Sequence, residues 1–387
     1  MKLFHKTLVA GAALAFAVMG TAFADGDFTF ENKISTDTVL LGDAADDNRR
    51  FAGITEQMKI DYSSEKVDAK ADVSFTLTGQ NQGVDPNKET IIRLEDAGIG
   101  MDGDYYIKFR PIEMLQIALA DAKSREYAAG AYFPVLDTKV NRGAYTGNIG
   151  LLVKPIEGLS IGAGIDLETN LVNTIDDEDK VYFNFGAEYE VENIGSFALA
   201  FNNVFNHFVV GAFAKITAIS DMDIYAGFSF CNDIGYNWMK FIDINITGND
   251  DRVVSGKFLL NGGFEYRGVE KLTLAADLAT NLFAETQSTW YDLYLGFKAA
   301  YDVNENLSVG GKANLFFDFV DDNNDENRNF CQSPFISISP EVSYKTGNHK
   351  FTAGLKMEFW HDYFTWRDTE RESRFGMCFP LSWSYSF

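Results

Sequence analysis

The carboxy-terminal stretch of the chain, Arg374–Phe387, alternates strictly between large apolar and small side chains. A strand points successive side chains to opposite faces. The stretch therefore predicts a strand with one aromatic, apolar face and one small, hydrophilic face. The apolar face consists of Phe375, Met377, Phe379, Leu381, Trp383, Tyr385 and Phe387. The small face consists of Gly376, Cys378, Pro380, Ser382, Ser384 and Ser386.

Two kinds of sheet contain such a strand. In a soluble sheet the apolar face packs on a core, whereas in a transmembrane barrel it contacts lipid and the small face lines a wet lumen. The aromatic last residue, preceded by apolar residues at alternate positions, resembles the terminal strand by which bacterial outer-membrane β-barrels are recognised for assembly. This resemblance implies the barrel-assembly machinery as a partner. The signal residues would be Phe379, Leu381, Trp383, Tyr385 and Phe387.

The first 24 residues predict a secretory signal peptide. Lys2 and Lys6 make its start positive, and Leu8–Met19 is an apolar run too short to span a bilayer as a helix. An A-x-A cleavage site follows at residues 22–24. The alternative is a retained membrane anchor. We expect residues 25–387 to form a single outer-membrane barrel domain.

One unit recurs along the chain: a strand, a short polar turn and a second strand that opens on an apolar residue. The clearest copies are residues 105–120, 149–167, 262–279 and 295–317. Eight turns are expected, near Ser64, Glu113, Glu157, Glu192, Ile219, Val269, Asn304 and Gly347. They join sixteen strands, and one more strand at each terminus makes 18, with 16 as the alternative because the first and fifth turns are the weakest. Short periplasmic turns and longer extracellular loops are typical of transmembrane barrels.

Apolar residues keep a period of two along most of these strands, as in Leu159–Leu167, and this argues against helices. A secreted β-sandwich or β-helix would also alternate. The secretion signal, the asymmetric hairpins and the terminal aromatic strand together favour a membrane barrel. The predicted fold class is therefore all-β, an antiparallel transmembrane β-barrel.

The composition limits the partners of the chain. It has 56 acidic and 33 basic residues, and its net charge of −23 becomes −25 without Lys2 and Lys6. Such a charge disfavours nucleic acid and anionic lipid. No run of about 18 apolar residues is present, so no transmembrane helix is expected. The 34 Phe, 17 Tyr and 5 Trp suit the aromatic girdles of a barrel in outer-membrane lipid.

The same parity places charges of both signs on the lumen side. The pore-lining candidates are Lys108, Asp166, Glu168, Glu188, Lys257, Glu265, Asp277, Asp292, Lys298, Lys312, Asp318, Lys356 and Glu358. With Asp61, Asp72, Lys59 and Lys70 they make ten acids against seven bases. Clustered acids select cations, so we expect a mild cation preference set mainly at the acidic outer loops. The alternative is that opposed lysines and carboxylates only solvate the lumen or pair across strands.

The acidic run Asp321–Glu326 contains a weak calcium motif. Asp321, Asn323 and Asp325 have the opening spacing of a calcium loop. The sixth position, however, is Glu326 rather than Gly, and the twelfth is not Glu. A solvated acidic loop is the favoured interpretation, and no cofactor is expected.

Catalysis is not favoured by the sequence. Only His207, His349 and His361 lie beyond the signal segment, and no G-x-S-x-G or H-E-x-x-H motif is present. An outer-membrane hydrolase therefore ranks below a channel. The three cysteines match no metal motif or disulfide framework.

Two features of the sequence suggest what the lumen contains. Lys123–Arg142, with Ala128–Ala131 followed by Tyr132-Phe133-Pro134, is the candidate for a segment folded into the lumen. The alternatives are an ordinary surface loop or an extra strand. An aromatic track for sugars is a second possibility, because the parity turns four aromatic residues inward: Tyr182, Tyr225, Tyr294 and Trp360.

Across its length beyond the signal segment, the chain resembles the porin-like class of bacterial outer-membrane barrels. The resemblance implies an outer-membrane diffusion channel for small hydrophilic solutes or cations, and homotrimers are common in that class. The competing interpretation is a surface-exposed structural or adhesin-type barrel, with a narrow or plugged lumen and loops that bind a ligand.

Overall fold

The computed structural model describes residues 26–41, 51–78, 98–120, 126–139, 143–144, 146–166, 182–204, 208–232, 237–240, 253–255, 257–284, 288–322, 335–361 and 373–387. All of its named elements are strands. In this part of the chain no helix has the length and apolar character needed to cross a bilayer. The predicted signal peptide lies outside the described residues.

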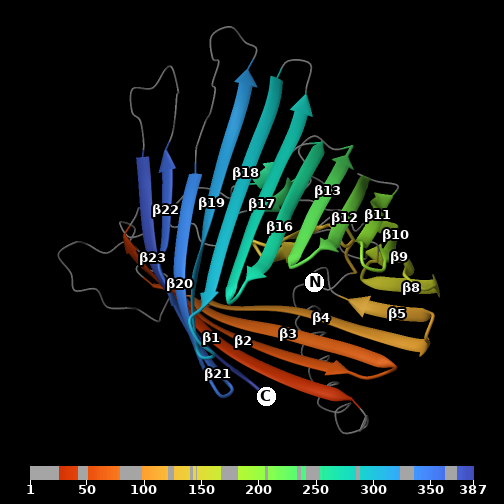
Figure 1. The fold of residues 1–387 in the computed structure, drawn as a ribbon, viewed down its shortest axis with the longest axis horizontal. Coiled ribbons are helices and arrows are strands. Elements are labelled where there is room, and N and C mark those ends of the chain that lie inside the picture. The colour runs from red at the N-terminus through yellow and green to blue at the C-terminus, as the bar shows by residue number, and fades with distance from the viewer. Residues whose placement is uncertain are drawn as a thin grey trace.

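The main sheet is a closed antiparallel barrel, as predicted (Figure 1). Its strands are β1 (Asp27–Leu41), β2 (Phe51–Ser63), β3 (Val67–Thr78), β4 (Gly98–Ile112), β5 (Leu115–Ala120), β8 (Ile149–Ile156), β9 (Leu159–Asp166), β10 (Tyr182–Val191), β11 (Gly195–Val204), β12 (Val209–Ile219), β13 (Met222–Cys231), β16 (Phe258–Val269), β17 (Leu272–Ala284), β18 (Ser288–Asp302), β19 (Leu307–Asp322), β20 (Phe335–Thr346), β21 (His349–Gly354), β22 (Lys356–His361) and β23 (Ser373–Ser386). Closure comes from β1, which pairs with β2 on one side and with β23 on the other.

The strand count is 18, because β21 and β22 are two halves of one strand. Both halves pair with β20 and β23 in an unbroken register. The break falls at Leu355, which lies opposite Pro340 on β20 and follows Gly354, the residue opposite Pro380 on β23. Leu355 N donates to Pro340 O at 2.9 Å, but a proline has no N–H to return the bond. The two prolines therefore explain the interruption.

All eight predicted turns lie between consecutive strands of the barrel. Several need a left-handed backbone, as tight hairpin turns do. Gly158 has φ +77°, and a Cβ there would collide with the carbonyl oxygen of Glu190. Asn193 and Asp221 adopt φ values of 61° and 60° in their own turns. Asn and Asp tolerate this conformation better than most other residues.

Side-chain exposure confirms the predicted alternation. On β11, Phe197, Leu199 and Phe201 are 45%, 53% and 43% exposed. Ala198 and Ala200, which lie between them, are almost fully buried. The exposed apolar face is the one expected to contact lipid, and the other faces the interior of the barrel.

The structure adds two small hairpins that the alternation pattern did not predict. One joins β6 (Tyr132–Phe133) to β7 (Thr138–Lys139) within the stretch after β5. The other joins β14 (Asn237–Lys240) to β15 (Val253–Ser255) within the stretch between β13 and β16. β19 also extends to Asp322, so Asp321 is a strand residue paired with Thr289.

Candidate functional site

The segment between β5 and β8 folds into the barrel. Its described residues, 126–139, 143–144 and 146–148, are called the inner loop below. Ala131, Phe133, Val135 and Ala144 are all at most 1% exposed. The prediction that Lys123–Arg142 contains a segment folded into the lumen is confirmed for the residues that the structure describes. In Figure 1 this gold to olive segment lies within the curve of the strands.

Side-chain amides from three strands bind the backbone of the inner loop. Asn184 on β10 donates from Nδ2 to the carbonyl oxygen of Thr146 at 3.1 Å. Asn202 on β11 donates to Ala144 O, and Asn261 on β16 donates to Gly130 O at 3.5 Å. The loop backbone is thus satisfied by strand side chains in place of a sheet ladder.

Two buried carboxylates complete this attachment. Asp277 on β17 accepts hydrogen bonds at Oδ2 from the backbone N–H groups of Val135, at 2.8 Å, and Leu136, at 3.3 Å. Asp166 on β9 accepts at Oδ1 from Asn148 N at 3.0 Å. Each carboxyl oxygen accepts from backbone N–H groups that have no partner in a sheet ladder. These two residues therefore fix the loop against β9–β17.

Packing against the same strands is close. A Cβ on Gly130 would collide with Ala214 N and Ala226 O, so only a glycine lets the loop approach this far. The Tyr132 ring lies 5.2 Å from that of Tyr225, in an edge-to-face arrangement.

Phe133 likewise lies 6.4 Å from Tyr294, which is fully buried. Tyr182 is also buried, so these inward aromatics pack in the interior and do not form the open sugar track considered above. The side chain of Trp360 lies outside what the structure describes.

Among the residues that the structure describes, none of the inner loop except Asp137 reaches the cavity along the opposite wall of the lumen. A cavity of about 590 Å³ lies between the loop residue Asp137 and residues of β1, β20, β21, β22 and β23. A second cavity of about 630 Å³ shares Glu31, Ser343, Lys350 and Ser384 with the first. It continues to the short turn around Asn304, between β18 and β19. Together they form a polar path from the inner loop to the end of the barrel that carries the short turns.

The predicted pore-lining residues divide into groups. Asp166 and Asp277 hold the loop, and Lys108 forms an ion pair with Glu126 at its start, with 2.5 Å between Nζ and Oε1. Lys356 lies 3.9 Å from Glu358.

Two more bind other residues of the barrel wall: Asp292 bonds to the neighbouring strand β17, whereas Glu265 pairs within its own strand, β16. Asp292 accepts from Asn281 Nδ2 at 2.7 Å, and Glu265 binds Arg267. The half-buried members are Glu188, Lys257, Lys298 and Lys312. Glu168 lies outside the described residues, as does the side chain of Asp318.

The predicted pore-lining set left out several residues of the two sites. The amides Asn184, Asn202 and Asn261 hold the loop, and the open wall includes Lys33 and Lys350. Lys350 has the same parity as Lys356 and could have been found in that way. Lys33 belongs to β1, whose alternation is weak because polar residues occupy both faces.

A calcium site receives no support from the described part of the chain. There, no group of three or more His, Cys, Asp or Glu residues could hold a metal ion. Asp321 lies in β19 and not at the start of a loop. Asn323 and Asp325 lie outside the described residues.

The histidines do not assemble a catalytic group in the described residues. His349 accepts a hydrogen bond at Nδ1 from Trp383 Nε1 at 3.2 Å and stacks on its ring. Trp383 lies on the outer face of β23, away from the polar path. His207 lies outside the described residues, and so does the side chain of His361.

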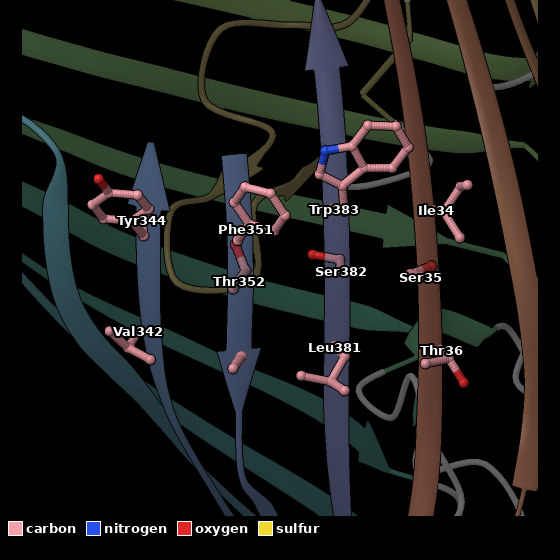
Figure 2. Close-up of a pocket in the computed structure, with 11 residues that line it drawn as sticks. Ile34, Ser35, Thr36, Val342, Tyr344, Phe351, Thr352, Leu381, Ser382 and Trp383 are labelled. Carbon is pink, nitrogen blue, oxygen red and sulfur yellow. The ribbon is translucent and has the colours of Figure 1, made fainter. Parts of the chain in front are cut away.

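The outer face of the same wall has an apolar groove of about 500 Å³ (Figure 2). Val342, Tyr344, Phe351, Leu381 and Trp383 project from β20, β21 and β23 on the viewer's side of the strands. Ile34 on β1 continues the groove, and the olive inner loop passes behind the strands in the same view. One wall thus separates an apolar surface from the polar path.

No family model matches the sequence, and no curated protein matches it either. Solved structures do match the fold. OccAB3 from Acinetobacter baumannii superposes with a TM-score of 0.53 at 10% identity, over 94% of this chain and 100% of that chain.

The outer membrane protein OpdK from Pseudomonas aeruginosa gives a TM-score of 0.53 at 12% identity, over 94% of this chain and 98% of that chain. OprD from Pseudomonas aeruginosa gives a TM-score of 0.50 at 10% identity, over 94% of this chain and 96% of that chain. The fold of this chain is therefore that of an 18-strand bacterial outer-membrane β-barrel of the porin-like class.

Proposed function

We propose that this protein is an outer-membrane channel for the passive diffusion of small hydrophilic solutes. The observation that carries the proposal is the unequal filling of the lumen. The inner loop covers the wall formed by β9–β17, while a continuous polar path remains along β1 and β20–β23. A barrel narrowed on one side and open on the other admits small solutes and excludes large ones.

One of the similar solved structures supports this proposal. OpdK has been solved with vanillate, and that structure superposes with a TM-score of 0.52 at 12% identity. A protein of this fold has thus been solved together with a small organic molecule. We infer a channel and not an enzyme for the present chain.

A mild cation preference forms a further part of the proposal, and we place it at the outer mouth. The net charge of −25 without Lys2 and Lys6 exceeds what the wall of the lumen accounts for, because its predicted residues are ten acids and seven bases. The expected surface loops hold acidic runs, such as residues 176–179. Acid clusters at a pore entrance concentrate cations.

The competing function is a surface-exposed barrel that does not conduct. The inner loop is the specific observation in its favour, because a loop that filled the lumen would act as a plug. A liposome-swelling assay with sugars of graded size separates the two. We expect swelling with small sugars and none with large ones, whereas folded protein that passes no solute of any size would favour the plug.

We propose in addition that the barrel-assembly machinery recognises the terminal strand. Phe379 and Leu381 are 37% and 41% exposed on the outer face of β23, where such a partner could reach them.

A further inference from the structure

The open wall carries charged and polar residues in rows that cross the strands. The first of these rows consists of Ser384 with one lysine on each side of it. Lys33 on β1 and Lys350 on β21 are each paired in register with Ser384 on β23. Neighbouring strands lie about 4.8 Å apart, so the two lysines are roughly 10 Å apart at their backbones. Within the described residues, neither lysine has an ion pair.

The next row along the strands consists of hydroxyl groups. Ser35, Ser382, Thr352 and Ser343 occupy consecutive positions on β1, β23, β21 and β20. Ser343 Oγ and Thr352 Oγ1 share a hydrogen bond of 3.0 Å. A hydroxyl both donates and accepts hydrogen bonds, so this row can bind the amide or hydroxyl groups of a solute.

Acidic groups lie beyond the hydroxyl row. Glu341 on β20 is paired in register with Gly354 on β21. Gly354 lies four residues after Lys350 along β21, so Glu341 and Lys350 are four residues apart in the strand direction. No ion pair to Glu341 is found in the part of the chain that the structure describes. Asp137 reaches the same cavity from the inner loop and accepts a hydrogen bond from the Tyr132 hydroxyl at 2.7 Å.

The other charged residues of this cavity already have partners. Glu31 lies 3.8 Å from Lys59, and Lys356 lies 3.9 Å from Glu358. What remains is a bipolar cavity: positive at Lys33 and Lys350, hydroxylic in the middle, and negative at Glu341 and Asp137. Opposite charges at the two ends of one cavity attract the two ends of a solute that carries a charge at each end.

The distance between the two ends sets the length of a matching ligand. Four residues of a strand rise about 13 Å, and flexible lysine and glutamate side chains shorten the gap between their charged groups. A molecule with adjacent charges cannot contact both ends at once, whereas an extended molecule can.

We propose that this cavity binds linear zwitterions, with the carboxylate between Lys33 and Lys350 and the ammonium group at Glu341 and Asp137. The inference rests on the proposed channel function and names a substrate class for it.

The test uses three probes that share one backbone. Triglycine carries both charges, N-acetyl-triglycine carries only the carboxylate, and triglycine amide carries only the ammonium group. Saturation-transfer NMR on the folded full-length protein in detergent measures their binding without requiring conduction. We expect triglycine to bind about fivefold more tightly than either singly charged probe, in line with one added ion pair in a partly hydrated site.

The variants assign each charge to its end of the cavity. Lys33→Gln with Lys350→Gln should make triglycine bind no better than triglycine amide, because the carboxylate loses its partners. Glu341→Gln should weaken triglycine and triglycine amide but leave N-acetyl-triglycine unchanged. Lys66→Gln, in the exposed turn between β2 and β3, is the matched control and should change nothing. If the double lysine variant does not fold, Lys350→Gln alone and Glu341→Gln carry the same test.

Equal binding of the three probes, or equal binding of free glycine and triglycine, would overturn the proposal. The same preparations are measured in planar bilayers in KCl. Conduction without discrimination among the probes refutes only the zwitterion site. Discrimination without conduction refutes only the channel function.

Discussion

Asp277 and Val135 are 142 residues apart in the chain, yet the Asp277 carboxylate accepts a hydrogen bond of 2.8 Å from the Val135 N–H. The adjacent N–H of Leu136 points to the same oxygen at 3.3 Å. Asp277 is 3% exposed, so the inner loop and β17 shield this contact from water. One side chain of the barrel wall thus determines where the middle of the inner loop sits.

Replacing Asp277 should loosen the inner loop. Asp277→Ala removes the acceptor of two backbone donors, and a buried donor left without a partner costs about 1–3 kcal/mol. We expect a larger and noisier single-channel conductance, with a smaller change in Asp277→Asn because the amide oxygen still accepts. Asp223→Asn is the control, since Asp223 binds Lys215 and Arg267 and not the loop. Wild-type conductance in Asp277→Ala would show that this contact does not position the loop.

Gly130 should tolerate no larger side chain. Because a Cβ there collides with the backbone of β12 and β13, Gly130→Val must push the inner loop away from the wall. We expect a shift of the loop toward the open path and a lower conductance. Gly262→Val is the matched control, because a Cβ at Gly262 meets only Tyr225 O, at 3.6 Å. Identical conductances of the two valine variants would contradict the close packing of the loop.

The terminal phenylalanine should matter more for assembly in cells than for folding in vitro. Phe387 exchanges two backbone hydrogen bonds of 3.0 Å with Phe30, and their rings lie 5.3 Å apart. An aromatic pair contributes about 0.5–1.5 kcal/mol. Phe387→Ala should therefore refold in detergent but yield less heat-modifiable barrel in the outer membrane. Phe109→Ala removes an equally outward-facing ring on β4 and should assemble normally. Equal yields would refute the assembly role.

The cation preference should depend on the outer acidic loops. Neutralising residues 176–179 with Asn and Gln should move the reversal potential in a KCl gradient toward that of an unselective pore. The effect should shrink at high salt, because the Debye length falls from about 10 Å at 0.1 M to about 3 Å at 1 M. Neutralising Glu192 in a short turn serves as the control. Anion preference in the unmodified protein would contradict this part of the proposal.

Much of the barrel could be predicted from the sequence, because its strands and turns depend on local patterns. Alternation fixes which side chains face lipid, and polar turn residues mark the hairpins. The small residues Ala128–Ala131 followed by aromatic ones also indicated a segment that packs inside the lumen. The break at Leu355 follows from Pro340 and Pro380, which the sequence displays.

The candidate site depended on pairings that alternation alone does not determine. Asp277 had the predicted inward parity, but its contact with Val135 depends on how a long segment crosses the lumen. The row of Lys33, Ser384 and Lys350 depends on the register of three strands, two of which come from opposite ends of the chain. Parity places a residue on a face, whereas register determines its neighbours.

Single-channel conductance with and without the inner loop tests the central claim most directly. Residues 123–142 would be replaced by a short Gly–Ser linker, and both proteins measured in planar bilayers in KCl. The account predicts a wild-type protein that already conducts through the open wall and a deletion variant with a clearly larger conductance. A silent wild-type protein that opens only on deletion would identify the loop as a plug and contradict the proposed channel.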